Sequence, residues 1–131
     1  MATTLTDERA AIESAVQLYV DGASKGDAEK LKAAFHGEAW MFGSVSGQRF
    51  DMPITQMIQE VTAHPLDADG AYRSHIVAVE QTGDAAVATL EESGCWGNLS
   101  FVDYFALAKI GGEWRIVNKT FAHTGGEMPT G

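Results

Sequence analysis

An acidic residue within an apolar run is the most informative candidate for chemistry in this chain. Asp103 lies in the segment FVDYF, with Phe101 and Phe105 two positions away on either side. Because side chains alternate between the two faces of a strand, Asp103 shares its face with both phenylalanines. If that face points inward, burial raises the pKa of the carboxyl and favours its neutral, hydrogen-donating form. Asp103 is therefore a candidate ligand-anchoring acid; the alternatives are a carboxylate paired with Lys119 or one at an exposed edge.

Three other polar side chains could act with this acid. Tyr19 lies on the apolar face of a predicted helix, where its hydroxyl either binds a ligand or serves only an internal partner. Lys119 has two interpretations. It is a buried cation that faces either Asp103 or an anionic ligand, or it is a solvated lysine whose stem packs along the sheet. His75 lies on a predicted strand, and an inward position would make it an acid–base candidate.

Aromatic side chains supply candidate walls for a ligand pocket, although such residues also fill cores and dimer interfaces. Flat rings could contact a ligand at Trp40, Phe42, Phe105 and Phe121. Trp96 could also line a pocket, whereas we expect Trp114 on the outer face of the sheet.

Composition narrows the classes of partner. The chain has 131 residues, and Asp and Glu outnumber Lys and Arg by 18 to 9, giving a formal charge of -9 at pH 7. This balance argues against nucleic acid or an anionic membrane as a partner, because both are bound by clustered Lys and Arg. The four histidines show no paired ligand spacing and Cys95 has no partner cysteine, so we expect no metal site. The sequence contains no phosphate loop or dinucleotide fingerprint, so we expect no cofactor.

The N-terminus and the cysteine content bear on the compartment. The single cysteine excludes an internal disulfide and favours a reducing environment. The first residues have neither the basic nor the apolar region of a signal peptide. No stretch approaches the ~18 apolar residues that a membrane span requires. We therefore expect a cytoplasmic protein that does not enter a membrane.

Apolar spacings of three and four predict the helices that must position these side chains. Helices are expected over the segments 6–24, 27–37 and 53–64. Thr6 and Asp27 are the expected N-caps of the first two, and Gly37 is expected to end the second. Strands are expected over 39–47, 49–50, 72–81, 85–92, 99–110 and 114–123. This order indicates an α+β domain with the helices on one face of an antiparallel sheet.

The order of elements, together with particular segments, resembles the NTF2-like superfamily of cone-shaped α+β domains. The similarity covers about residues 7–123 and rests on VQLYV, GD, FHGEA, GDAAVA, FVDYF and GEWRIVNKTF, in that order. The last two segments are most similar to the branch labelled as putative lumazine-binding proteins, near SnoaL-like and ketosteroid isomerase-like members. The resemblance implies one domain over 1–124, with three N-terminal helices on a strongly curved, mixed or antiparallel sheet of about six strands, and a flexible tail over 125–131.

The ketosteroid isomerases are the best understood enzymes that this chain resembles. Their mechanism uses an aspartate base and an oxyanion hole made of a tyrosine and a protonated aspartate. The resemblance places the oxyanion tyrosine at Tyr19, the oxyanion aspartate at Asp103 and the base at Gly43, which has no side chain. The chain therefore keeps the polar donors of such a site and lacks its base.

The hairpin between the last two strands decides whether Lys119 faces the same side as Asp103. A three-residue loop over 111–113 places Asp103 opposite Phe121, whereas a two-residue Gly-Gly turn places it opposite Thr120. We choose the three-residue loop, because the resemblance requires Asp103 and Phe121 to point inward together.

We therefore predict a protein that binds a small aromatic or polycyclic molecule in the cavity of the cone, without an identifiable general base. The predicted ligand contacts are Tyr19, Trp40, Phe42, Asp103, Phe105, Lys119 and Phe121. The first alternative is an isomerase, dehydratase or cyclase acting on a carbonyl-containing molecule, with Asp103, Tyr19 and His75 as catalytic candidates. The second is a protein-interaction module. In each case we expect a homodimer through the convex face of the sheet, with an apolar centre at Val102, Tyr104, Trp114 and Ile116.

Overall fold

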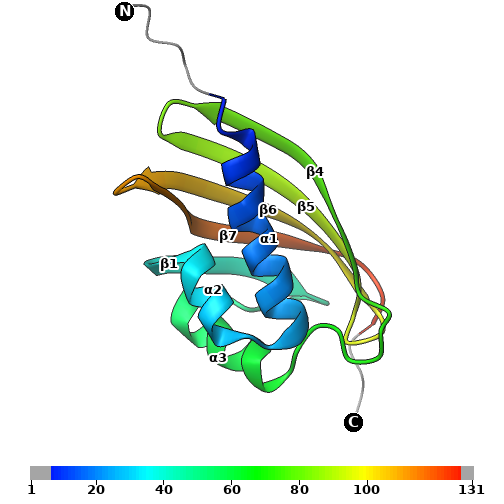
Figure 1. The fold of residues 1–131 in the computed structure, drawn as a ribbon. Helices are drawn as coiled ribbons and strands as arrows, with labels where there is room; N and C mark the ends of the chain where they lie inside the picture. Colours follow the sequence, from blue (N-terminus) through cyan, green and yellow to red (C-terminus); the bar gives the residue numbers. More distant parts are fainter. Residues whose placement is uncertain (1–6, 128–131) are drawn as a thin grey trace, which may run out of the picture.

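Three helices pack on one face of a long curved sheet in the computed structural model, which describes residues 7–127 (Figure 1). The helices are α1 (Arg9–Lys25), α2 (Ala28–Ala34) and α3 (Ile54–Ala63). The strands are β1 (Phe35–Val45), β2 (Gln48–Arg49), β3 (Met52–Pro53), β4 (Arg73–Thr82), β5 (Ala85–Cys95), β6 (Leu99–Ile110) and β7 (Glu113–Gly125). The predicted α+β cone, with three helices on a curved mixed sheet, is confirmed.

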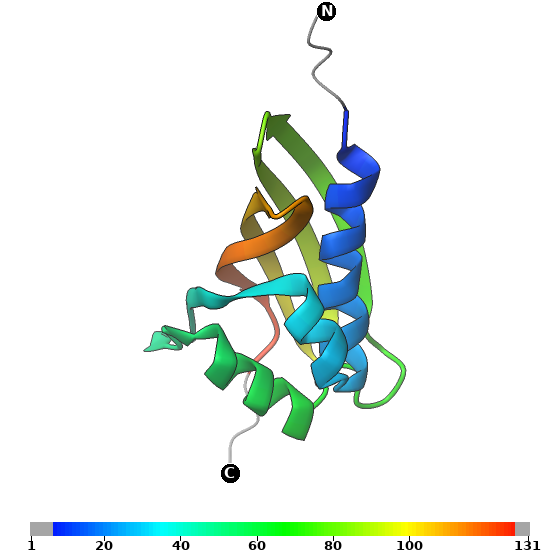
Figure 2. The same ribbon diagram turned by 60° about the vertical axis from the view of Figure 1, so that its left-hand side comes forward.

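The sheet combines one parallel pairing with an antiparallel meander. Its strand order is β2-β1-β7-β6-β5-β4, with β3 paired to β1 off this path. Only the β1–β7 pair is parallel, and every other pair is antiparallel. Helix α1 packs across β4, β5 and β7, while α2 and α3 pack near β1 on the same side (Figures 1 and 2).

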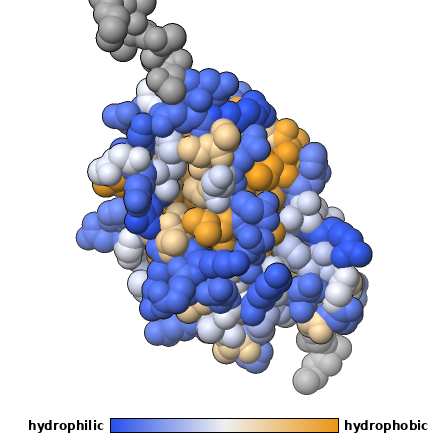
Figure 3. All heavy atoms as spheres, in the orientation of Figure 1, coloured by the Kyte–Doolittle hydropathy of each residue, from blue (hydrophilic) through white to orange (hydrophobic). Residues whose placement is uncertain are grey.

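Side-chain polarity follows these layers. On the face seen in Figure 3, hydrophilic side chains cover most of the surface and hydrophobic ones emerge in smaller areas between them. The buried positions of α1 lie three and four residues apart, as the apolar spacing predicted. No helix within residues 7–127 is both long and apolar enough to cross a membrane.

Of the helix ends that the sequence predicts, the start of α2 at Asp27 is confirmed and its end at Gly37 is not. Gly26 adopts the left-handed conformation with φ 71° that ends α1, and the Asp27 carboxylate accepts hydrogen bonds from the first backbone N–H groups of α2. The predicted cap Thr6 lies outside the described residues. The expected end of α2 at Gly37 is wrong, because the backbone is already extended at Phe35, where β1 begins and pairs with Ile116 of β7.

The β6–β7 hairpin also differs from the prediction. Ile110 pairs with Glu113, so the turn consists of Gly111 and Gly112, both with positive φ. The three-residue loop chosen from the sequence is therefore wrong. With this turn alone, Asp103 would lie opposite Thr120 and the inner face of β7 would carry even-numbered residues throughout.

A β-bulge restores the inward position of the later β7 residues. Leu107 pairs with Ile116 but Ala106 pairs with Asn118, so Val117 is an extra residue in β7. One extra residue shifts the pairing by one, and Asp103 consequently lies opposite Phe121. The predicted pairing is thus confirmed, although its cause is a bulge and not the turn.

The same bulge overturns the predicted position of two apolar residues. Trp114 and Ile116 were expected at the centre of the outer face, but both are buried on the inner side, with 7% and 0% exposure. They precede the bulge, where even-numbered residues point inward, whereas Lys119 and Phe121 follow it, where odd-numbered residues do. Val102 and Tyr104 do lie on the outer face of β6, as expected.

Gly43 is required by close packing between β1 and β7. It lies beside Phe121 in the parallel pairing, and the Phe121 ring occupies the space that a side chain at position 43 would need. Gly37 lies on the same strand, but nothing lies within 4 Å of the place of its missing Cβ. The two glycines therefore offer a matched pair for testing how tightly β1 packs.

We expect Gly43→Ala to destabilise the fold by about 1–3 kcal/mol, because its Cβ overlaps the Phe121 ring and the core must shift. Gly37→Ala should leave stability unchanged or raise it by about 0.4–1 kcal/mol, because alanine restricts the unfolded chain without a clash. Urea unfolding of both variants measures the difference. Equal stability of the two variants would contradict the packing described for Gly43.

Candidate functional site

A largely apolar cavity of about 610 Å³ lies between the helices and the inner face of the sheet. Its size is typical of a small-molecule site. Its walls come from α1, β1, α3, β5, β6, β7 and the loop segments beside them. The lining residues are Tyr19, Met41, Val45, Phe50, Met57, Glu60, Val61, His64, Leu66, Glu92, Trp96, Leu99, Phe101, Lys119 and Phe121.

Glu92 is the central polar residue of the cavity, and the sequence analysis missed it. It lies on the inner face of β5 and is only 4% exposed. Its carboxylate accepts a 2.6 Å hydrogen bond from the Tyr72 hydroxyl and a 3.3 Å hydrogen bond from the Tyr19 hydroxyl. The period of two in β5 could have identified it, because Ala88 and Leu90 on the same face are buried.

Asp103 lies next to Lys119 behind the cavity wall. Its side chain is fully buried, and the nearest Lys119 contact joins Nζ to Oδ1 at 3.7 Å. Neither carboxyl oxygen accepts a hydrogen bond from any residue that the structure describes. Burial raises the pKa of Asp103 well above its ordinary value, and the charge of Glu92 raises it further, while Lys119 opposes both. The neutral form predicted from the sequence is therefore favoured.

Lys119 is inside the molecule and not in solvent. Its side chain is 8% exposed, and Nζ lies 4.7 Å from the centre of the Phe121 ring and 5.4 Å from that of Tyr19. The thioether sulfur of Met41 is 3.6 Å from Nζ. The alternative of a solvated lysine is wrong, because the bulge turns this part of β7 inward. Cation–π contacts stabilise the ammonium without using up its hydrogen-bonding capacity.

Tyr19 connects the helical layer to the polar cluster. Its ring is 2% exposed and makes edge contacts with Phe35 and Phe105, whose ring centres are 5.9 and 5.2 Å away. Burial, followed by the charges of Glu92 and Asp103, raises the pKa of its hydroxyl well above the usual value. Tyr19 is therefore a permanent hydrogen donor. Phe105 supports its ring but does not line the cavity.

Trp40, Phe42 and His75, three of the predicted site residues, lie away from the cavity and from the polar cluster. Trp40 and Phe42 are 44% and 37% exposed on the outer face of β1, where their rings stack at 5.9 Å. Their even-numbered positions point away from the helices, so the expectation that they contact a ligand in the cavity is corrected. His75 is exposed on β4 and does not line the cavity. The structure thus joins Tyr19, Lys119 and Phe121 at the cavity.

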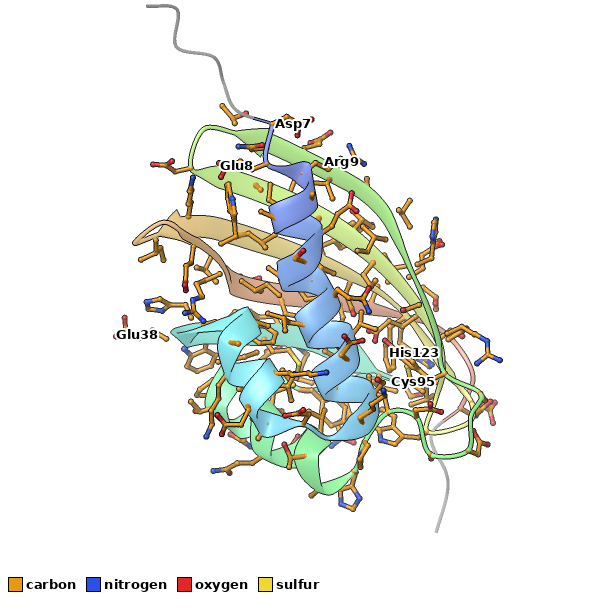
Figure 4. The ribbon with its side chains drawn as sticks, viewed as in Figure 1. Asp7, Glu8, Arg9, Glu38, Cys95 and His123 are labelled. Carbon is orange, nitrogen blue, oxygen red and sulfur yellow. The ribbon has the colours of Figure 1, made fainter. Side chains whose placement is uncertain are left out.

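The surroundings of Cys95 and the positions of the possible metal ligands were compared with the requirements of thiol and metal sites. Cys95 and His123, labelled in Figure 4, come from the ends of β5 and β7 at the same end of the sheet. Burial raises the pKa of the Cys95 thiol, and the His123 ring interacts with the backbone carbonyl of Gly125. Within residues 7–127, no group of three or more His, Cys, Asp or Glu side chains could hold a metal ion.

The cluster can act on a ligand in two ways. Lys119 can donate hydrogen bonds to an oxygen, because its described polar contacts are a carboxyl at 3.7 Å and a sulfur. Glu92 can accept a proton from a ligand in the same cavity, while the hydroxyls of Tyr19 and Tyr72 hold its carboxylate in place.

Comparisons with known proteins agree with the fold. The profile of the family described as "Putative lumazine-binding" matches residues 7–122. "Aldolase FrzH" of Cladobotryum sp is 25% identical over 122 residues, which cover 92% of this chain and 96% of that protein. An NTF2-like protein of unknown function from Methylobacillus flagellatus is 31% identical, with a TM-score of 0.80 over 91% of this chain and 94% of that one. Another, from Silicibacter pomeroyi, is 27% identical, with a TM-score of 0.81 over 95% and 100% of the two chains.

The wild-type protein is expected to lose stability as the pH rises because of Asp103, and Asp103→Asn should remove this loss. Because the pKa of Asp103 is raised in the folded protein, this carboxyl keeps its proton at pH values where the unfolded chain has lost it. Stability of the wild type relative to Asp103→Asn should therefore fall as the pH rises from about 4 toward the folded pKa. Urea unfolding of both proteins from about pH 4 to pH 8 measures this difference.

A surface carboxylate provides the control for this measurement. The Arg49 guanidinium lowers the pKa of Asp51, so this pKa shift is opposite in sign to that of Asp103. The stability that Asp51 contributes is lost only as the pH falls. Asp51→Asn should therefore show no progressive change relative to the wild type above about pH 4. A constant gap between the wild type and Asp103→Asn over the same range contradicts a raised pKa at Asp103.

Proposed function

The chain belongs to the family described as "Putative lumazine-binding", and we propose from this that its cavity binds a small, largely apolar, aromatic or polycyclic molecule through a hydrogen-bond-accepting oxygen. The observation that carries the proposal is the position of Lys119, whose amine lines an apolar cavity without a close oxygen partner. A carbonyl or carboxylate oxygen on the ligand would supply that partner. Such a charge-assisted hydrogen bond is stronger in a dry site than in water.

The apolar walls favour a flat ligand body. Trp96, Phe101 and Phe121 line the cavity with aromatic surface, and Met41 and Met57 add flexible thioethers that adapt to irregular shapes. Fused rings that carry carbonyl oxygens, as in lumazines and flavins, combine both requirements. These features support a ligand of that chemical class and leave its identity to experiment.

A second candidate function is catalysis on a carbonyl-containing small molecule, of the isomerase, dehydratase, cyclase or aldol type. The favouring observation is that Glu92 and Lys119 line the same cavity. Glu92 would remove a proton next to the carbonyl, and Lys119 would stabilise the negative charge that develops on its oxygen. Glu92 would then replace the base that Gly43 lacks, from a different strand. The name of the Cladobotryum relative as an aldolase agrees with this class.

A thermal-shift screen of lumazine-like, flavin-like and steroid-like rings with carbonyl groups is expected to find compounds that raise the unfolding midpoint, because a ligand of the folded state stabilises it. Lys119→Met should bind these compounds at least about tenfold more weakly, because one charged hydrogen bond contributes about 1.5–3 kcal/mol. Lys109→Met is the matched control, because Lys109 pairs with Glu8 and does not line the cavity. Equal affinity of Lys119→Met and the wild type contradicts the anchoring role.

The same compounds separate binding from catalysis. Each one that binds is incubated with the protein in D₂O, and deuterium uptake next to its carbonyl is followed by mass spectrometry. An enzyme of the proposed type accelerates this exchange, and Glu92→Gln should slow it by about 10²–10⁴-fold. Binding without any acceleration would leave the binding function intact and reject the catalytic candidate.

We also propose that the chain forms a homodimer through the outer face of the sheet. Tyr104, Trp40 and Phe42 are 56%, 44% and 37% exposed there, which leaves large aromatic surfaces in contact with water. Phe42 and Tyr104 both lie opposite Thr120, so their strands bring them into one row across β7. An interaction with a different protein through the same face corresponds to the module considered from the sequence.

Sedimentation of the wild type at micromolar concentration is expected to show a dimer, and Tyr104→Glu should convert it to a monomer because a charge would be buried in the interface. Gln56→Glu, on the exposed side of α3, is the control and should leave the dimer unchanged. A wild-type protein that sediments as a monomer contradicts the proposed dimer.

A further inference from the structure

Lys119 differs from the other lysines of the chain in its surroundings. It is the only lysine among residues 7–127 whose side chain is buried, and it opens onto the cavity described above. The others are exposed or partly exposed on the outside of the molecule. A protein that needed only a positive charge at this end of the sheet could place it in solvent at a much smaller desolvation cost. The burial of this amine at a ligand cavity therefore indicates a chemical role for Lys119.

The contacts of Nζ leave its reactive side available. Its nearest carboxyl oxygen, Asp103 Oδ1, is 3.7 Å away, which is longer than a hydrogen bond. The other close contacts are the Met41 sulfur at 3.6 Å and the faces of the Tyr19 and Phe121 rings. None of these neighbours holds the amine in a fixed direction with a strong bond. The amine can therefore turn toward a molecule in the cavity.

Asp103 offers a way to neutralise the amine without creating a new charge. Transfer of one proton from the Lys119 ammonium to the Asp103 carboxylate converts an ion pair into a neutral pair of amine and carboxylic acid. The raised pKa of Asp103 favours its acceptance of this proton. Only a neutral amine can attack a carbonyl carbon.

We infer that Lys119 is a nucleophile that condenses with an aldehyde or ketone in the cavity to form an imine. This inference rests on the proposed small-molecule site and names the carbonyl compound as its substrate class. The Nζ lone pair forms the new C–N bond, the carbonyl C–O bond breaks, and both hydrogens of the amine leave with the oxygen as water. No oxidant or reductant is needed. Asp103 then returns its proton to the imine nitrogen, which gives an iminium ion beside a carboxylate.

An iminium ion would extend the role proposed for Glu92. The positive nitrogen withdraws electrons from the neighbouring carbon and makes its hydrogens more acidic than those of the parent carbonyl compound. Glu92 lines the same cavity and is fixed by two tyrosine hydroxyls, so its carboxylate is available to accept such a hydrogen. The Lys119 nitrogen would then hold the substrate as an iminium ion, and the Glu92 carboxylate would accept a proton from the carbon next to it.

Reductive trapping tests the imine directly. The whole protein is incubated with cinnamaldehyde and sodium cyanoborohydride, which reduces an iminium ion to a stable secondary amine. Peptide mapping should find an adduct on Lys119 with the added mass of the aldehyde less one oxygen atom. Its formation should be at least about tenfold faster than at the exposed Lys25 and Lys32, because binding brings the reactants together. Labelling of Lys119 no faster than of those two lysines overturns the inference.

Variants separate this inference from the proposed binding function. Lys119→Arg keeps the charge but cannot form an imine, and it should lose the rapid adduct while still gaining stability from carbonyl ligands in the thermal-shift screen. Asp103→Asn should slow trapping about tenfold or more at neutral pH, whereas Lys109→Arg should leave it unchanged. If carbonyl ligands stabilise the wild type but leave Lys119 unlabelled, the imine is rejected and the binding function stands. If the carbonyl compounds neither stabilise the protein nor label Lys119, the imine and the binding function are both rejected. Where a variant fails to fold, the peptide map of the labelled wild-type protein still tests the imine.

Discussion

The polarity of the cavity depends on one extra residue in β7. Before Val117 the inner face of the strand carries Trp114 and Ile116, and after it the inner face carries Lys119 and Phe121. Without the bulge, the strand alternation would turn the lysine to the outside and bring its neighbours inward. The contact between Lys119 and Asp103, the ring wall at Phe121 and the close approach of Gly43 all follow from this single shift of register.

Three buried ionisable groups lie close together and differ in their hydrogen bonding. Two carboxyl groups, Glu92 and Asp103, and one amine, Lys119, lie within the interior of a small protein. Two tyrosine hydroxyls hydrogen-bond to Glu92, whereas Asp103 receives no hydrogen bond from the described residues. The two acids therefore differ in their hydrogen bonding, and burial raises the pKa of Asp103 well above its ordinary value.

Much of the fold could be predicted from the sequence, because its helices and strands follow simple periodic patterns. The helical spacing around Tyr19 predicted its buried ring, and the alternation around Asp103 placed it on the face of Phe101 and Phe105, which is the buried one. The bulge could not be predicted, since the RIVNK segment that contains Val117 has no glycine or proline to mark it. Trp40 and Phe42 were placed by residue type, and an aromatic side chain suits either face of a strand. Glu92 was overlooked because a carboxylate at the end of an apolar alternation looks like the beginning of a solvent-exposed turn.

The packing of Gly43 against Phe121 also restricts how this chain could acquire a different activity. An acid at position 43 cannot be accommodated while the Phe121 ring fills the space that its Cβ would need. The ring would have to be replaced by a smaller side chain first, and that change alone would open a void in the cavity wall. The size of the side chain at position 121 therefore limits which side chains position 43 can carry.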